Sequence, residues 1–348
     1  MLLGLCIIFS TTILAQIPQG YYDGTQGLTG DSLRYKLHDI ISNGYVQGTY
    51  ADLWTSFQST DKRPDGKVWD MYSDIPNGTP PYLFTFVTNQ CGGYSAEGDC
   101  YNREHTVPES WFNGAYPMYS DLFHLVPTDG YVNNRRSNYP YGDVSSASWT
   151  SLNGCKLGTC SDSGYTGTVF EPIDSFKGDF ARIYFYMATR YKDEIPSWNS
   201  SGVFSSNNLS AWSKKMFLQW NSLDPVSMKE IHRNDSTYKI QHNRNPYVDH
   251  PEWINAVWNS GQQIYSATLP EISFFPNPAS NYLHIAVSAF NDIIKINLYD
   301  EFGRCVWTSK KEQPNDIIPV FYLKNGIYYL SVTGYQITLT QKIIVLHN

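Results

Sequence analysis

The spacing of apolar residues changes once along this 348-residue chain, near residue 268. Before that point, segments such as 178–191 repeat apolar residues every three to four positions, the period of an α-helix with one buried face. After it, segments such as 283–287 carry apolar residues at every second position, as strands with one buried face do. We therefore expect two domains: an α+β, mainly helical domain over 16–268, and a small all-β sandwich over 269–348.

The first fifteen residues form an apolar run that ends in alanine. A run of this length is too short to cross a bilayer as a helix, and a small residue at its end is typical of a signal-peptide cleavage site. No Lys or Arg precedes the run, which departs from the usual signal peptide, and an N-terminal core helix is the alternative. We expect a signal peptide over 1–15, a secreted or cell-surface product, and no transmembrane segment in the mature chain.

Five cysteines remain after that cleavage, and four of them form two close pairs. Cys91 and Cys100 lie nine positions apart, Cys155 and Cys160 lie five apart, and both pairs occur in segments rich in Gly, Ser and Asp. In an oxidising compartment such pairs favour two local disulfides, although the sequence leaves crossed pairing open. A structural zinc site is the alternative, but the chain has no C-x-x-C pair. Cys305 is left over, and we expect it to be a buried strand residue.

Charge is distributed unevenly, which matters because the net charge of −7 does not by itself suggest a partner with phosphate groups. Residues 177–244 carry ten Lys and Arg against six Asp and Glu, whereas residues 16–176 carry nine against eighteen. A local basic surface formed by 177–244 is compatible with phosphate contact. Solvated lysines scattered over the surface are the alternative interpretation.

Residues 102–140 concentrate the side chains that hydrolysis of a phosphodiester requires. Glu104 and His105 are neighbours, and on an extended strand neighbouring side chains point to opposite faces. Asn133 and Arg136 are three positions apart and share one face of a helix. A carboxylate, an imidazole, an amide and a guanidinium can thus hold one divalent cation, activate water beside it and bind phosphate.

Secondary structure around this stretch can also be predicted. The apolar and aromatic run 82–88 is predicted to be a strand, and a second strand is expected to lead into His105. Thr128 and Asp129 are helix-start residues, so we expect a helix over 131–136. A strand, a loop and a helix would then bring the base, the metal ligands and the phosphate contact together.

Ordered blocks of residues in this stretch match a known family. The matching residues are Asn102-Arg103-Glu104-His105, Pro108, Ser110-Trp111-Phe112, Ser120-Asp121-Leu122, Leu125, Pro127-Thr128-Asp129-Gly130, Val132-Asn133 and Arg136-Ser137-Asn138-Tyr139. They resemble the bacterial endonuclease I family, secreted or periplasmic nucleases with a His-metal finger, also called a ββα-metal site. The likeness continues in segments 21–41, 176–191 and 233–258.

The resemblance implies a nuclease domain with a ββα-metal finger and gives roles to its residues. His105 is the expected general base, since a neutral imidazole can take a proton from water at neutral pH. Glu104 and Asn133 are the expected ligands of one Mg²⁺ ion, with Mn²⁺ or Ca²⁺ as alternatives, because hard oxygen atoms suit such ions. Arg136 is expected to grip the scissile phosphate, since a guanidinium can bind phosphate through two hydrogen bonds.

Other polar residues receive supporting roles. Arg135, Arg103 and Arg244 are expected to contact the substrate or to support it electrostatically. Two interpretations of His124 stay open: it orients a partner in the site, or, as we favour, it is a packed structural histidine. Asn138 is expected to help hold the finger together.

The C-terminal segment carries a second resemblance. Its matching residues are Pro276-Asn277-Pro278, Leu298-Tyr299-Asp300, Gly303-Arg304, Leu323, Gly326-Ile327-Tyr328 and Gln341-Lys342. They resemble the C-terminal sorting domain of the type IX secretion pathway, which implies the secretion machinery as a partner. An ordinary carbohydrate- or protein-binding sandwich is the alternative.

Together these expectations describe a secreted endonuclease that depends on a divalent metal and hydrolyses DNA, and RNA as well, with little sequence specificity. No helix-turn-helix or zinc-finger pattern occurs for reading base edges, which favours recognition of the phosphate backbone. Two other functions stay open. One is a zinc-dependent hydrolase of another ester that uses His105, His124 and an acid, although no H-E-x-x-H motif occurs. The other is a non-catalytic binding protein of the cell surface.

Overall fold

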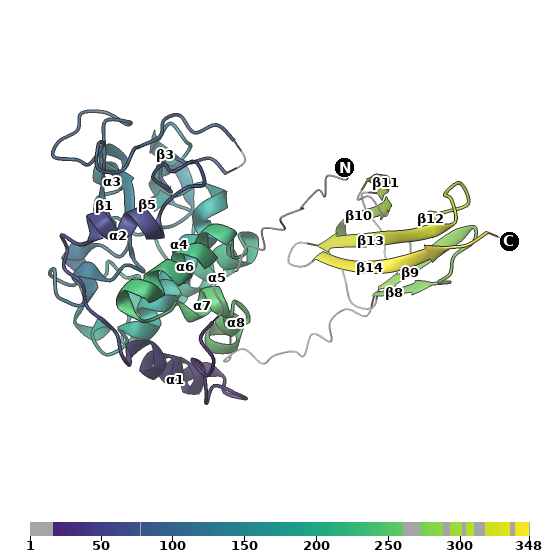
Figure 1. Cartoon of the computed structure of the whole chain (residues 1–348), viewed down its shortest axis with the longest axis horizontal. Helices are drawn as coiled ribbons and strands as arrows, with labels where there is room; N and C mark the ends of the chain where they lie inside the picture. Colours follow the sequence, from purple (N-terminus) through teal and green to yellow (C-terminus); the bar gives the residue numbers. More distant parts are fainter. Residues whose placement is uncertain are drawn as a thin grey trace, which may run out of the picture. The chain divides into compact units, whose positions relative to one another are not determined.

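The chain divides into two compact units, Met1–Gln262 and Gln263–Asn348 (Figure 1). The computed structural model describes residues 17–76, 78–259, 272–287, 293–300, 304–309, 317–334 and 338–347. The expected signal peptide, 1–15, lies outside the described residues. Within the described part, no helix is both long enough and apolar enough to cross a membrane.

The first unit mixes helices with short strands. Its helices are α1 (Gly30–Ser42), α2 (Leu53–Thr60), α3 (Gly130–Arg136), α4 (Asp174–Arg190), α5 (Ala211–Leu223), α6 (Met228–Gln241), α7 (Pro246–Asp249) and α8 (Glu252–Trp258), with 3₁₀ turns at Glu109–Trp111, Met118–Ser120 and Ile195–Ser197. Its strands are β1 (Tyr101–His105), β2 (Leu125–Asp129), β3 (Val144–Thr150), β4 (Lys156–Cys160), β5 (Thr168–Glu171), β6 (Phe204–Ser205) and β7 (Asn208–Leu209). They form the sheets β1-β2, β3-β4-β5 and β6-β7.

Helix α4 is enclosed by the rest of the first unit. Every residue from Phe176 to Arg190 is buried, with α1, α5 and α7 packed around the helix. Tyr184 stacks on Phe217 of α5, with ring centroids 4.5 Å apart. The sequence predicted a helix over 178–191 with one buried face. The helix is present, but it is buried on all faces, so its polar residues need partners inside the protein.

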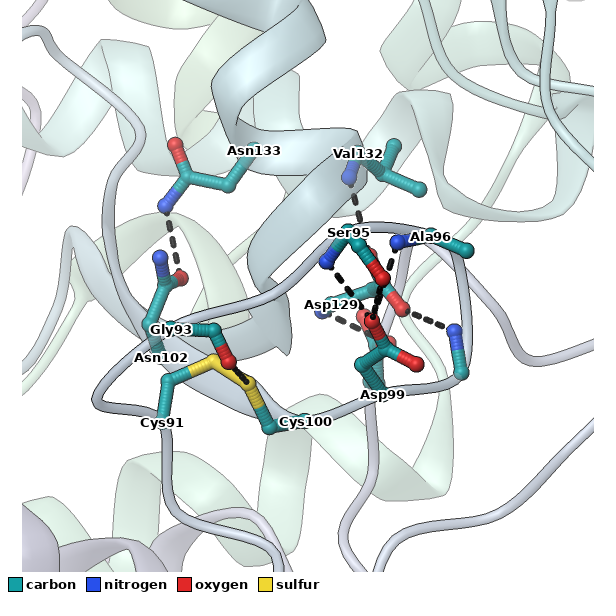
Figure 2. The surroundings of a disulfide bond; sticks show 12 residues. Cys91, Gly93, Ser95, Ala96, Asp99, Cys100, Asn102, Asp129, Val132 and Asn133 are labelled. Atoms are coloured by element: carbon teal, nitrogen blue, oxygen red, sulfur yellow. Dashed lines mark hydrogen bonds between the residues drawn. A yellow bond between two sulfur atoms is a disulfide. The ribbon is translucent and has the colours of Figure 1, made fainter.

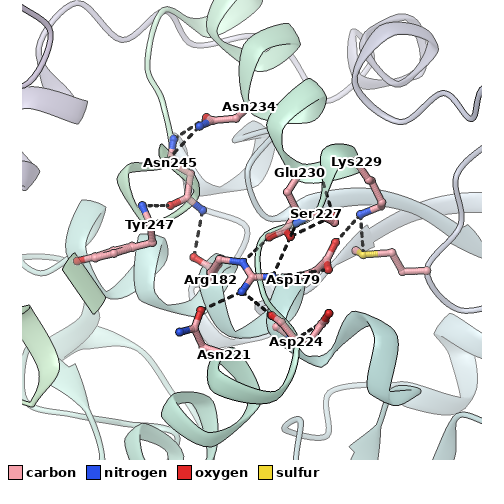
Figure 3. A network of polar contacts seen from close by, with 12 residues as sticks. Asp179, Arg182, Asn221, Asp224, Ser227, Lys229, Glu230, Asn234, Asn245 and Tyr247 are labelled. Carbon is pink, nitrogen blue, oxygen red and sulfur yellow. Dashed lines mark hydrogen bonds and ion pairs between the residues drawn. The ribbon is translucent and has the colours of Figure 1, made fainter. Parts of the chain in front are cut away.

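The charged residues of α4 find those partners on α6. Arg182 donates to both carboxylate oxygens of Glu230, and Lys229 donates to Asp179 at 2.7 Å (Figure 3). Glu230 also forms a capping box with Ser227 at the start of α6. These buried charges are therefore paired within one network that joins α4 to α6.

Strands β1 and β2 form an antiparallel pair that leads directly into α3. In this pair Tyr101 lies opposite Asp129, and His105 lies opposite Leu125. Asp129 ends β2 and caps α3, because its carboxylate accepts a hydrogen bond from the backbone N–H of Val132 at 2.9 Å. The predicted strand into His105 and the predicted helix start at Asp129 are both confirmed.

The apolar run 82–88 is not a strand, contrary to the sequence prediction. Its first residues have no regular secondary structure, its last residues form a turn, and Val87 adopts a φ of 67°. Phe84 is instead buried in a small cluster with Val68 and Tyr101. The run is apolar because these side chains pack against β1, and this does not require a strand.

One of the two expected disulfides is present. Cys91 and Cys100 are bonded, with their Cα atoms 5.0 Å apart (Figure 2). The second pairing is wrong, because Cys155 and Cys160 are both free and buried. Strand β4 runs between them, and an extended backbone separates residues five positions apart by about 16 Å, whereas a bridge needs Cα atoms within about 7 Å. Cys305 begins β11 (Cys305–Ser309), but it is exposed and not buried as expected.

The second unit consists of β-strands in two antiparallel sheets. The strands are β8 (Ile272–Phe275), β9 (Tyr282–Val287), β10 (Ile293–Asp300), β11, β12 (Ile317–Pro319), β13 (Gly326–Gly334) and β14 (Thr338–Val345). One sheet has the order β12-β9-β8 and the other the order β11-β10-β13-β14. Leu283 from the first sheet and Ile296 and Leu330 from the second are buried in one common core. The alternation seen in the sequence predicted this arrangement.

Candidate active site

Helix α3 packs across β1, and both elements carry residues predicted for the site. Asn102 and Glu104 share one face of β1, because strand side chains alternate. From α3, Asn133 Nδ2 donates to Asn102 Oδ1 at 2.8 Å, and Arg136 Nη1 donates to Glu104 Oε1 at 2.7 Å. The structure thus brings Glu104, Asn133 and Arg136 to one side of the strand. By the same alternation, His105 belongs to the opposite face.

Glu104 is a buried carboxylate with two close partners. Its Oε1 accepts the hydrogen bond from Arg136 and a second from the hydroxyl of Tyr72 at 2.9 Å. Tyr72 in turn shares a hydrogen bond of 2.6 Å with Tyr141. Burial raises the pKa of Glu104 to about 7, because the loss of water outweighs the opposing effect of the Arg136 guanidinium. Sequence reasoning missed Tyr72 and Tyr141, since a distant tyrosine gives no local signal of a carboxylate partner.

Arg136 is enclosed by the protein, with only 1% of its surface exposed. Besides Glu104, its guanidinium donates to the backbone carbonyl oxygens of His105, Thr106 and Tyr139. It also lies over the ring of Tyr141, 4.6 Å from the centroid. The predicted contact between Arg136 and the scissile phosphate does not match this placement, because the side chain is buried and its hydrogen bonds inside the protein use four of its five N–H groups. Its position instead fixes Glu104 and the end of β1.

Asn133 is the second residue on this side of β1, after Glu104, whose side-chain oxygen suits a metal ion. Its Nδ2 is held by Asn102, so its amide oxygen points away from that contact (Figure 2). Carboxylate and amide oxygens are hard donors, and Mg²⁺ takes one or two such protein ligands while it keeps several waters. Glu104 and Asn133 therefore fit Mg²⁺. Within the described residues, no three His, Cys, Asp or Glu side chains are grouped so as to hold a metal ion.

His105 is surrounded by aromatic rings. The rings of Tyr50 and Tyr119 lie nearly parallel to it, with centroids 5.6 and 5.4 Å away. Its Nε2 is 3.3 Å from the backbone oxygen of Tyr119. Burial, with a further contribution from His124, lowers the pKa of His105 to about 3. The imidazole is therefore neutral at physiological pH, which is the form that accepts a proton.

His124 is completely buried next to His105, with 5.5 Å between the ring centroids. Its Nε2 is 2.6 Å from the backbone oxygen of Met118. Burial lowers the pKa of His124 to about 4, so this ring is also neutral. It lies directly before β2 and not within it. His124 is therefore a buried structural histidine that packs against His105.

The other residues predicted to surround the substrate differ in exposure. Arg244 is buried and forms ion pairs with Asp235 and Asp249 at 2.8 and 2.6 Å. Its predicted substrate contact does not match this internal position. Arg135 is exposed on α3, and Asn138 is exposed in the turn that follows α3.

The guanidinium of Arg103, on β1, lies over two aromatic rings. Its guanidinium carbon is 3.7 Å from the ring centroid of Tyr50 and 4.5 Å from that of Trp54. Its Nη1 donates to the backbone oxygen of Tyr50 at 2.8 Å. The two ring contacts and this hydrogen bond together favour one orientation of the guanidinium.

Arg233 of α6 is a further residue that sequence reasoning missed. Its Nη2 donates to the backbone oxygens of Leu122 and Leu125 at 2.5 and 2.7 Å, and its Nε donates to Asp61 at 2.9 Å. The contact with Leu125 fixes the first residue of β2, which lies opposite His105. Because Leu122 and Leu125 are more than a hundred positions away in the sequence, no local sequence pattern predicts this role of Arg233.

Comparison with known proteins agrees with this division of the chain. A family model described as Endonuclease I matches residues 29–252, and one described as Secretion system C-terminal sorting domain matches residues 273–346. The extracellular ribonuclease of Bacillus subtilis (strain 168) is 33% identical to this chain over 247 residues, which are 68% of this chain and 78% of that protein.

Two further relatives match shorter segments. Endonuclease-1 of Buchnera aphidicola subsp. Baizongia pistaciae is 36% identical over 130 residues, 37% of this chain and 46% of that protein. A periplasmic deoxyribonuclease of Aeromonas hydrophila is 28% identical over 134 residues, 38% of this chain and 48% of that protein. The family match over most of the first unit shows that this chain belongs to the endonuclease I family of nucleases, and that it carries a secretion system C-terminal sorting domain.

Proposed function

We propose that this nuclease is a secreted, divalent-metal-dependent endonuclease that hydrolyses phosphodiester bonds of DNA and RNA with little sequence specificity. The placement of Glu104 and Asn133 on one side of β1, with His105 as the next residue of the strand after Glu104, carries the proposal. Relatives named as a ribonuclease and a deoxyribonuclease support a substrate range that includes both nucleic acids. Membership of a nuclease family argues against the alternative of a non-catalytic binding protein. Oxygen donors favour magnesium over zinc, whose sites use His and Cys as well.

His105 is the general base in this mechanism. With its Nε2–H donating to the backbone oxygen of Tyr119, the neutral ring carries its lone pair on Nδ1. That nitrogen accepts the proton from the attacking water, and the carbonyl of Tyr119 stabilises the charged ring that results. A base positioned in this way contributes about 10²–10⁴-fold to the rate.

Glu104 and Asn133 are the residues that would hold the cation, and strands β1 and β2 with helix α3 would then form a ββα-metal site. A bound Mg²⁺, or Mn²⁺ or Ca²⁺ in its place, supplies positive charge that stabilises the transition state. Arg136 and Tyr72 hold the Glu104 carboxylate in one orientation, and Asn102 holds the amide of Asn133. Arg136 thus acts as a positioning residue.

Contacts to the phosphate backbone come from arginines outside the buried cluster. Arg103 precedes His105 by two residues on the same strand face, and Arg135 is exposed on α3. Contacts of this kind bind every phosphate alike and carry no base information. Little sequence specificity is the expected result.

Removal of metal tests the proposed function directly. We expect purified protein to cut plasmid DNA and an RNA transcript with Mg²⁺ and to cut neither with EDTA. Asn133→Ala should raise the Mg²⁺ concentration for half-maximal activity about tenfold or more, since even loss of a residue behind a ligand costs that much. Asn134→Ala, on an exposed neighbour in the same helix, is the matched control and should leave the metal requirement unchanged. Cleavage that survives chelation would contradict the proposal.

The C-terminal sorting domain and the relatives named extracellular both support secretion of this nuclease. We expect a chain truncated after residue 268 to retain its activity on plasmid DNA, because the site residues and their partners all precede that point. The same truncation should stop release into the medium in a host that has the matching secretion machinery. Cleavage assays and blots of the medium measure the two effects. A folded truncated protein without activity would show that the division of labour between the units is wrong.

A further inference from the structure

The strand face that carries His105 also carries an arginine without a carboxylate partner. Arg103 is two residues away from His105, so alternation places both on this face. Its guanidinium lies over the rings of Tyr50 and Trp54. Within the described part of the chain, no Asp or Glu lies within ion-pair distance of Arg103, in contrast to Arg136, which is paired with a carboxylate at 2.7 Å. The positive charge of Arg103 is therefore held rigidly and remains available to an anion.

The aromatic surface continues from Tyr50 towards solvent. Tyr50 stacks on Tyr119, with centroids 4.5 Å apart and an angle of 24° between the rings. Tyr116 stands edge-on against Tyr119 at 5.4 Å, and 47% of its surface is exposed. We call Trp54, Tyr50, Tyr119 and Tyr116 the aromatic strip. The strip leads from an exposed ring to His105, because Tyr119 also stacks on the histidine.

The chemistry of this strip fits a flat apolar group joined to an anion. An unpaired nucleotide has this form: its base offers a free π-face to a tyrosine ring, and its phosphate meets a guanidinium. In a duplex, neighbouring bases cover both faces of each base, so the rings have nothing to stack on until a base leaves the helix. Arg103 still reaches a phosphate in either form of nucleic acid. The rings therefore distinguish the two forms, and the arginine does not.

We propose that the aromatic strip binds unpaired nucleotides beside the scissile bond, so that the enzyme prefers single-stranded nucleic acid to duplex. This inference rests on the proposed function, because it takes His105 as the base that marks the scissile position. The two kinds of contact make different contributions. Stacking on Tyr116 acts on single strands alone, whereas Arg103 acts on single strands and duplexes together.

One labelled oligonucleotide, alone and annealed to its complement, provides the test. We expect wild type to have the higher kcat/KM on the single strand. Tyr116→Ala should lower that kcat/KM about fivefold or more, the low end of the range for stacking of one base, and leave the duplex value unchanged. Tyr116→Phe should behave as wild type, because stacking needs the ring and not the hydroxyl. Arg103→Gln should lower both values and reduce the salt dependence of binding by about one unit.

Tyr35→Ala is the matched control, since Tyr35 is 41% exposed on α1 and has no part in the proposed strip. It should change neither value. Equal losses on single strand and duplex with Tyr116→Ala would overturn the proposal, and so would equal cleavage of both forms by wild type.

A binding measurement separates this proposal from the proposed function. Fluorescence anisotropy of the same oligonucleotide in EDTA reports affinity without cleavage. Weaker binding of the single strand by Tyr116→Ala would support the aromatic strip, whether or not wild type cleaves the oligonucleotide. If wild type cleaves neither form with Mg²⁺, that result would contradict the nuclease mechanism but not the aromatic strip. Unchanged binding of the single strand by Tyr116→Ala would reject the strip, whatever the enzyme cleaves.

Discussion

His105→Ala should reduce hydrolysis of plasmid DNA by at least about 10²-fold, the lower end of what a positioned base supplies. Affinity for DNA and for Mg²⁺ should stay close to wild type, because the base acts in the transition state and not in the ground state. The loss should therefore appear in kcat and not in KM. Single-turnover cleavage, together with DNA binding measured in EDTA, separates the two.

The control for this variant is His232→Ala, on an exposed histidine of α6, which should keep full activity. Because His105 packs against Tyr50 and Tyr119, thermal unfolding of the variant must be recorded beside its kinetics. A folded His105→Ala protein with nearly wild-type cleavage would refute the mechanism, even though the chain would remain a nuclease.

Arg136→Ala should destabilise the first unit by about 3–5 kcal/mol, the cost typical of breaking a buried ion pair. The change leaves the Glu104 carboxylate buried without its guanidinium, and it removes the hydrogen bonds that Arg136 donates to the carbonyl oxygens of His105 and Thr106. Urea unfolding followed by tryptophan fluorescence measures the effect. Activity should fall as well, since Glu104 loses the contact that orients it.

Arg135→Ala provides a neighbouring control on the same helix. Arg135 is exposed, so its loss should change stability by no more than about 0.5 kcal/mol and should weaken DNA binding instead. The sequence assigned both arginines to the substrate, and the structure predicts opposite phenotypes for them. Unchanged stability with weakened DNA binding in Arg136→Ala would restore the phosphate contact first expected from the sequence.

Features set by local chemistry could be predicted from the sequence. Asp129 starts α3 because its side chain caps the next turn, and this signal lies within four residues. Glu104 and Asn133 come from different elements, and the structure places them on one side of β1 as the family resemblance implied. Their role as metal ligands stays a prediction. The division into a mainly helical domain and a β domain could be predicted because helices and strands repeat apolar residues with different periods.

Features set by distant contacts could not be predicted. Whether Arg136 points outward or inward depends on partners such as Tyr72 and Tyr141, and these are remote in sequence. The run 82–88 has strand-like composition, yet no neighbouring strand is placed to pair with it among the described residues. The spacing of Cys155 and Cys160 suggests a small loop, but the segment between them is an extended strand.

The disulfide between Cys91 and Cys100 lies against the first residue of α3, the helix that carries Asn133. The N–H of Gly130, the first residue of α3, donates to the backbone oxygen of Cys100 at 2.9 Å, and a Cβ atom at Gly130 would lie 2.7 Å from the sulfur of Cys91. Closing a loop of this size stabilises a fold by about 2–3 kcal/mol, and such bonds form in oxidising compartments and not in the cytoplasm. The start of the helix that carries Asn133 therefore rests against a bond that a reducing compartment would break.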